Sequence, residues 1–136
     1  MSVVALLIAI GAPQAGADRR EEMFSVGQAI RFEEPIGPAV DQYQTCLSDN
    51  LKGQSLVPDQ LDQIFEGTIQ KCASVRSGAI RVADQLLRDA GSSDAAKRSA
   101  SIMQTFDDID ADHRGHGKRL KAHLEQISHP ITNERG

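Results

Sequence analysis

The fold is decided by residues 61–91, which read LDQIFEGTIQKCASVRSGAIRVADQLLRDAG. Apolar side chains recur here in steps of three and four residues, the spacing of one face of an α-helix. They are Leu61, Phe65, Ile69, Cys72, Val75, Ala79, Val82, Leu86 and Ala90. Pro58 and Asp59 suit the start of a helix, and Gly91 suits its end. The pattern therefore predicts one long helix between Pro58 and Gly91.

A second long helix is predicted on the C-terminal side of Gly91. Ser92 or Ser93 can cap it, Asp94 lies favourably in its first turn, and Pro130 stops it. Its apolar side chains again follow the helical period: Ile102, Phe106, Ile109, His113, Leu120, Leu124 and Ile127. A shorter helix is predicted on the N-terminal side, between Pro38 and Gly53.

These three helices predict an all-α fold. The tight turn at 91–93 folds the two long helices into an antiparallel hairpin. The apolar arc of the first long helix is wider than one neighbour needs, because Ile64 and Val75 lie to one side of its centre and Ile69 and Ile80 to the other. The short helix therefore covers the hairpin, and residues 36–129 form a three-helix bundle domain.

Composition limits the classes of function. The chain has 136 residues, 40% of them apolar, which is the size of one ordinary domain and excludes a multidomain enzyme. Its formal net charge is -4. Non-specific nucleic-acid binding needs a surplus of basic side chains, so we do not expect it.

The N-terminal residues predict export. Residues 1–17 carry no charged side chain, and the apolar run from Val3 to Ile10 is too short to span a membrane. Ala15 and Ala17 form the small-residue pattern of a signal-peptidase site, which predicts a signal peptide over 1–17 and a periplasmic or secreted protein. Residues 18–35 are expected to be a flexible leader or a short helix, and residues 130–136 a disordered tail.

Export affects how the two cysteines are interpreted. Cys46 and Cys72 are the only cysteines, and an oxidising compartment favours a disulfide between them. A metal-binding thiol pair or a nucleophile is the alternative, but neither cysteine has CxxC spacing or a nearby histidine. The sequence therefore predicts a Cys46–Cys72 bridge that pins the short helix to the hairpin.

The densest group of polar side chains is DDIDADHRGH, residues 107–116. It does not fit a calcium loop, since His113 stands where glycine is needed and Arg119 where a bidentate glutamate is needed. A transition-metal site remains open as an alternative, because Asp112 and His116 face one another on a helix. Its ligands would be Asp112, His116 and either His113 or His123. His113 also falls within the apolar stripe, so a core histidine is the simpler interpretation.

Arg76 lies inside the apolar arc of the first long helix. A buried guanidinium without a partner is costly. Reflection of the hairpin about Ser92 puts Arg76 opposite Asp108, so we expect an inter-helix ion pair from Arg76 to Asp108 or Asp112.

Three surface features are weaker. A basic run, Arg114 to Lys121, suggests a patch for anionic lipid or an acidic partner, and Gly115 and Gly117 within it predict a kink, a close contact or a break. Small residues on one side of the first long helix suggest a homodimer face: Gly67, Ser74 and Gly78.

No catalytic motif is recognisable, and a slender bundle offers little concave volume. We therefore expect a non-enzymatic interaction module of the envelope or periplasm, without a cofactor, that binds a protein partner or an envelope surface. A periplasmic metal-binding or metal-sensing protein is the alternative.

Overall fold

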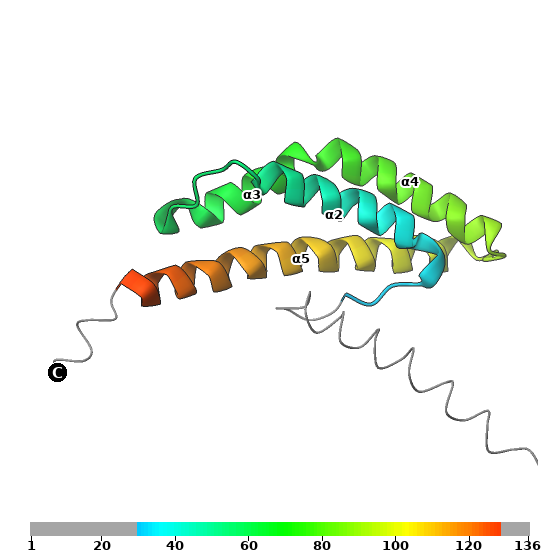
Figure 1. Cartoon of the computed structure of the whole chain (residues 1–136). Coiled ribbons are helices and arrows are strands. Elements are labelled where there is room, and N and C mark those ends of the chain that lie inside the picture. Colours follow the sequence, from blue (N-terminus) through cyan, green and yellow to red (C-terminus); the bar gives the residue numbers. More distant parts are fainter. Residues whose placement is uncertain (1–29, 129–136) are drawn as a thin grey trace, which may run out of the picture.

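The computed structural model describes residues 30–128. Helices in this range are η2 (Glu34–Ile36), α2 (Gly37–Leu51), η3 (Pro58–Gln60), α3 (Leu61–Lys71), α4 (Ala73–Asp89) and α5 (Ala95–Ser128), and no strand occurs there (Figure 1). The expected all-α fold is confirmed. The predicted signal peptide over 1–17, most of the predicted leader over 18–35 and the predicted tail over 130–136 lie outside the described residues.

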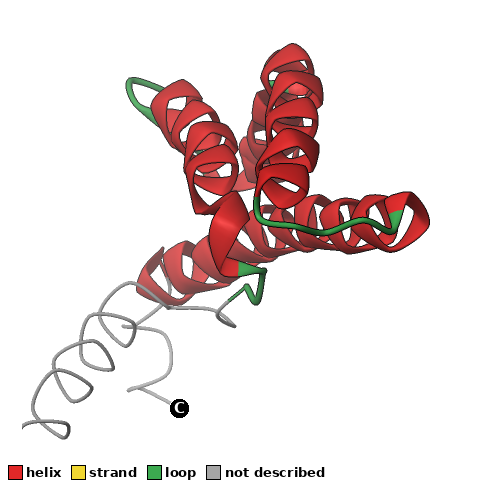
Figure 2. Ribbon diagram, turned by 90° about the vertical axis from the view of Figure 1, so that its right-hand side faces the viewer, coloured by secondary structure: helices red, strands yellow, loops and turns green. Residues whose placement is uncertain are grey.

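The helices form a bundle in which α3 and α4 follow one another along α5, with α2 beside them (Figure 1). α2 packs chiefly against α4, and α5 packs against both α3 and α4. Figure 2 shows that the helices lying above α5 diverge from one another when viewed along the bundle. The short helix and the antiparallel hairpin thus have the arrangement that the sequence predicts.

The prediction of one long helix between Pro58 and Gly91 is wrong in one respect, because the helix is divided at Cys72. The backbone of Cys72 has φ -93° and ψ 9°, so α3 ends and α4 begins at this residue. Apolar residues keep their three- and four-residue steps on both sides, so the sequence pattern does not reveal the division. Its structural consequence is that α3 lies mainly against α5, whereas α4 also supports α2.

The turn between α4 and α5 is formed by Gly91, whose φ of 96° is a conformation that favours glycine. The cap of α5 differs from the prediction: Asp94, rather than Ser92 or Ser93, accepts a hydrogen bond from the Lys97 backbone N–H at 3.1 Å through Oδ1. A short carboxylate at this position satisfies a free backbone donor and suits the positive end of the helix. The hairpin turn is therefore fixed at both helix ends.

The core lies where α2, α4 and α5 meet. Tyr43, Phe106, Ile102 and Ile36 are fully or almost fully buried, and the Cys46–Cys72 pair lies beside them. Val82 departs from the predicted apolar face, since it is 42% exposed. Ile30, at the start of the described range, packs against this core.

α5 is one continuous helix of 34 residues that passes through Gly115 and Gly117. The two glycines predict a kink, a close contact or a break. The structure shows the close contact, at Gly117 against the ring of Phe65. Between residues 30 and 128, no helix combines the length and the apolar content needed to cross a membrane.

Candidate functional site

The two cysteines are joined by the predicted disulfide. Cys46 of α2 and Cys72 at the α3–α4 junction are bonded, with their Cα atoms 6.0 Å apart. The side-chain amide of Asn50 donates to the Cys46 carbonyl oxygen at 2.9 Å and lies 3.4 Å from the Cys72 sulfur. Asn50 of α2 therefore contacts both halves of the bridge. The bridge holds α2 against the point where α3 ends and α4 begins.

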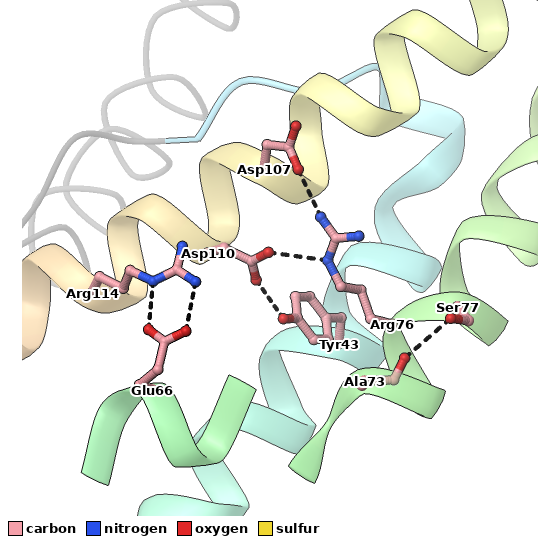
Figure 3. A network of polar contacts seen from close by, with 8 residues as sticks. All are labelled: Tyr43, Glu66, Ala73, Arg76, Ser77, Asp107, Asp110 and Arg114. Carbon is pink, nitrogen blue, oxygen red and sulfur yellow. Dashed lines mark hydrogen bonds and ion pairs between the residues drawn. The ribbon is translucent and has the colours of Figure 1, made fainter. Parts of the chain in front are cut away.

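A polar network crosses the centre of the bundle and joins three helices (Figure 3). The Tyr43 hydroxyl of α2 donates to Oδ1 of Asp110 in α5. Arg76 of α4 donates from Nε to Oδ2 of Asp110 at 3.1 Å and from Nη2 to Oδ1 of Asp107 at 2.8 Å. Both carboxylate oxygens of Asp110 are thus engaged, each by a different helix.

The predicted partners of Arg76 are wrong. Asp108 instead accepts a hydrogen bond from the side-chain amide of Gln104 at 2.8 Å, and Asp112 lies 3.9 Å from Arg119. Reflection of the hairpin about Ser92 predicts the correct height of the Arg76 partners along α5, but not the side of α5 on which they lie. Positions 107 and 110 are three residues apart and share a helix face, whereas position 108 is turned about 100° away from 107.

This network offers no reactive group. Burial, followed by the hydrogen bond to Asp110, raises the pKa of Tyr43 above its ordinary value, so the phenol keeps its proton. Asp110 is only 8% exposed, and every buried side-chain nitrogen and oxygen among the described residues has a hydrogen-bond partner. The network therefore has a structural role, because its contacts fix the rotation of α2, α4 and α5 relative to one another.

His113 is held between α3 and α5. Thr68 donates its hydroxyl hydrogen to the Phe65 carbonyl oxygen at 2.7 Å, so its oxygen accepts from Nε2–H of His113 at 2.6 Å. The Phe65 ring lies against both His113 and His116, with centroid distances of 4.8 and 5.7 Å. Burial lowers the pKa of His113, and the neighbouring His116 lowers it further. His113 is therefore a neutral, core-facing histidine.

The structure does not assemble the predicted metal ligands. Asp112, His113 and His116 line a shallow groove of about 240 Å³ between α2 and α5, while His123 is exposed further along α5. Within residues 30–128, no group of three or more His, Cys, Asp or Glu side chains is placed to hold a metal ion. Contact of His113 with Thr68 and of Asp112 with Arg119 explains why these side chains do not converge.

The predicted basic patch is partly neutralised by α3. Arg114 forms a bidentate pair with Glu66 at 2.7 and 2.9 Å (Figure 3), and Lys121 lies 3.8 Å from Asp62. The hydrogen bond from Arg114 lowers the pKa of Glu66. Carboxylates on α3 thus pair with two of the four basic side chains of this run, while Arg119 lies 3.9 Å from Asp112 of α5 and Lys118 is exposed.

A larger groove, which was not predicted from the sequence, lies between α4 and α5. It has a volume of about 430 Å³, and we call it the α4–α5 groove. Its lining comes from about two turns of α4 and one turn of α5: Ile80, Arg81, Asp84, Gln85 and Arg88 of α4, with Ser99, Ile102 and Met103 of α5. Met103 is 40% exposed although large apolar side chains are usually covered. The sequence signal that could have found it is this methionine, one position beyond the buried Ile102.

Charges in the α4–α5 groove are arranged around Asp84. Its Oδ1 accepts from Nε of Arg98 at 3.0 Å, and its Oδ2 lies 2.7 Å from Nη2 of Arg88. The hydrogen bond from Arg98 is the main cause that lowers the pKa of Asp84. Arg98 is 7% exposed and also donates to the Ser92 carbonyl oxygen at 2.8 Å. The carboxylate is therefore fully engaged by two guanidinium groups.

Arg81 is, with Arg88, one of two arginines that line the α4–α5 groove. It is exposed and has no ion-pair partner within residues 30–128. The groove lining therefore contains two guanidinium groups, those of Arg81 and Arg88, and one carboxylate, that of Asp84, which is also paired with the buried Arg98. The side chains that line the groove thus carry one more positive than negative charge, although the whole chain has a net charge of -4.

Comparisons of the chain with protein-family models, with curated proteins and with solved structures gave no match.

Proposed function

We propose that this protein is an exported helical module that acts without catalysis, by binding a segment of a protein partner in the α4–α5 groove. The observation that carries the proposal is the groove itself, with Ile80 and Met103 on its apolar floor and charged side chains at its rim. Helix pairs that recognise peptides bind them in grooves of this composition. Methionine suits such a floor because its unbranched side chain adapts to different partners.

The rest of the molecule supports binding rather than chemistry. The buried Tyr43 and Asp110 are engaged with one another, and Asp110 also accepts from Arg76, so that this network joins three helices. His113 is engaged with Thr68. The disulfide and this network hold α2, α4 and α5 in fixed positions, and a rigid surface loses less entropy when it binds a partner.

Export is the second part of the proposal. It is supported by the uncharged residues 1–17 and by the Cys46–Cys72 bond, since disulfides persist in oxidising compartments. Sequencing the N-terminus of the protein recovered from outside the cytoplasm tests it. We expect the chain to start at Asp18 with the disulfide formed; a chain that stays in the cytoplasm with residues 1–17 attached would contradict export.

The binding function is tested by site-specific photo-crosslinking in the organism that produces the protein. A photoreactive amino acid replaces Met103 or Ile80 in the groove, or the exposed Gln42 of α2 as a matched control. We expect the same discrete protein adduct from both groove positions and not from position 42. If positions 80 and 103 give no adduct, or give the same adducts as position 42, the groove is not the binding site.

A further inference from the structure

We infer that the partner segment of the α4–α5 groove is an acidic amphipathic helix, which places apolar side chains on the groove floor and carboxylates against Arg81 and Arg88. This inference rests on the proposed function, because it names the chemistry of the partner that the groove binds.

The shape of the α4–α5 groove argues for a helix as its occupant. On α4 the lining runs from Ile80 to Arg88, eight residue steps or about 12 Å along the helix axis. On α5 it runs from Ser99 to Met103. A groove between two adjoining helices, two turns long, matches the face of a third helix that carries apolar side chains at positions i and i+3 or i+4.

The charges of the groove argue for acidic residues on that helix. Asp84 cannot attract a cation strongly, since both its oxygens are engaged by Arg88 and Arg98. Arg81 has no acidic partner among the described residues, and Arg88 is more than half exposed, at 56%. Arg81 therefore has no counter-charge among the described residues, and Arg88, although paired with Asp84, stays accessible to a second carboxylate beside the apolar floor. Opposite charges across an interface speed encounter and exclude partners of the wrong sign.

The position of the two arginines adds a geometric restraint. Arg81 and Arg88 are seven residues apart on α4, so they lie on the same side of the helix, about two turns from one another. A partner helix with carboxylates about two turns apart can engage both guanidinium groups at once. Arginine binds carboxylates in a bidentate manner, which favours a defined register over general attraction.

The test is a selection of helix-forming peptides from a displayed library. The library keeps apolar residues at i, i+3, i+4 and i+7 and randomises the flanking positions. It is selected on the full-length, disulfide-bonded protein, and peptides that also bind the Met103→Glu variant are discarded. A second blocking variant, Ser99→Trp, fills the groove from an exposed position, and circular dichroism confirms that both variants keep the helical fold.

We expect the selected peptides to be enriched in Asp and Glu at flanking positions about seven residues apart. Their affinity should fall on the order of tenfold in Arg81→Glu and should weaken as salt is raised, because screening shortens the range of the interaction. The matched control is Lys118→Glu, which makes the same change in net charge at an exposed position far along α5. It should leave the affinity unchanged.

The other outcomes separate the two proposals. Selected peptides that bind the groove but are neutral or basic would overturn the inference and leave the proposed function standing. An equal loss of affinity in Arg81→Glu and Lys118→Glu would overturn it too, since attraction would then be general. If no peptide distinguishes the native protein from both Met103→Glu and Ser99→Trp, the groove does not bind helices, and the proposed function fails with the inference.

Discussion

Gly117 of α5 lies so close to Phe65 of α3 that a Cβ atom at position 117 would be 2.8 Å from Cγ of the ring. The absence of a side chain lets the two helices approach at this point. Gly115, only two residues earlier, faces no such ring: a Cβ there would meet the flexible end of Arg119, with Nη1 at 3.1 Å. The two glycines therefore have different structural roles within one continuous helix.

The first prediction uses this contrast. Alanine is favoured over glycine within a helix by about 1 kcal/mol. At position 117 this gain is outweighed by crowding against Phe65, since overpacking costs about 1–3 kcal/mol. We expect Gly117→Ala to lower the free energy of unfolding by up to about 2 kcal/mol and Gly115→Ala to raise it by up to about 1 kcal/mol, as measured by urea denaturation. Equal effects of the two substitutions would show that the Phe65 contact is not tight.

The second prediction concerns the disulfide. Cys46 and Cys72 are 26 residues apart, and closing a loop of that length stabilises a protein by about 3.5 kcal/mol in the chain-entropy treatment. We expect the double variant Cys46→Ala, Cys72→Ala to lose stability of this order in denaturant unfolding. Dithiothreitol should lower the native protein to a similar level and leave the double variant unaffected. A native protein that is insensitive to the reductant would contradict this.

The third prediction concerns the polar network. Asp110→Asn removes the charge that faces Arg76 and weakens the acceptor of the Tyr43 hydroxyl, so we expect a loss of about 3 kcal/mol in the free energy of unfolding. Asp107→Asn should cost less than about 1 kcal/mol, because the Asp107 side chain is 65% exposed. Asp108→Asn, which does not contact Arg76, serves as the control and should change stability least. A reversed order of Asp108 and Asp110 would show that Arg76 pairs differently.

The fourth prediction is a pH dependence that arises from His113. Burial holds the pKa of His113 below the ordinary value of 6.5. Above about pH 6.5 the imidazole is neutral in both the folded and the unfolded chain, so its full contribution to stability is present. As the pH falls below 6.5, the unfolded chain takes up the proton first, and the folded state loses stability. We expect the free energy of unfolding to decline between pH 7 and pH 5.

The groups that face His113 define the controls. His116 disfavours its protonation, whereas Asp110 and Asp112 favour it. His113→Gln should reduce the slope of unfolding free energy against pH, while His123→Gln, at an exposed position, should leave it in place. Hydrogen bonds from arginine lower the pKa values of Glu66 and Asp84. These two carboxylates therefore affect stability only at more acidic pH, below their ordinary pKa values of 4.5 and 3.8. An unchanged slope in His113→Gln would assign the pH dependence to another group.

By itself, the sequence determined the helical fold, the hairpin turn at Gly91 and the pairing of Cys46 with Cys72. These features follow from the period of apolar residues, from glycine at a turn and from there being only two cysteines. Each depends on neighbours along the chain or on simple counting, so no coordinates are needed to predict them.

Only the tertiary structure decided which side chains meet across helices. One residue along a helix corresponds to a rotation of about 100° and a rise of about 1.5 Å, so a small uncertainty in register exchanges Asp108 for Asp107 and Asp110 as partners of Arg76. The same sensitivity governs the contact of Gly117 with Phe65, the separation of the histidines from a common centre and the opening of the groove beside Met103. Sequence periodicity gives the buried face of each helix, but the rotation and spacing of the packed helices determine what that face touches.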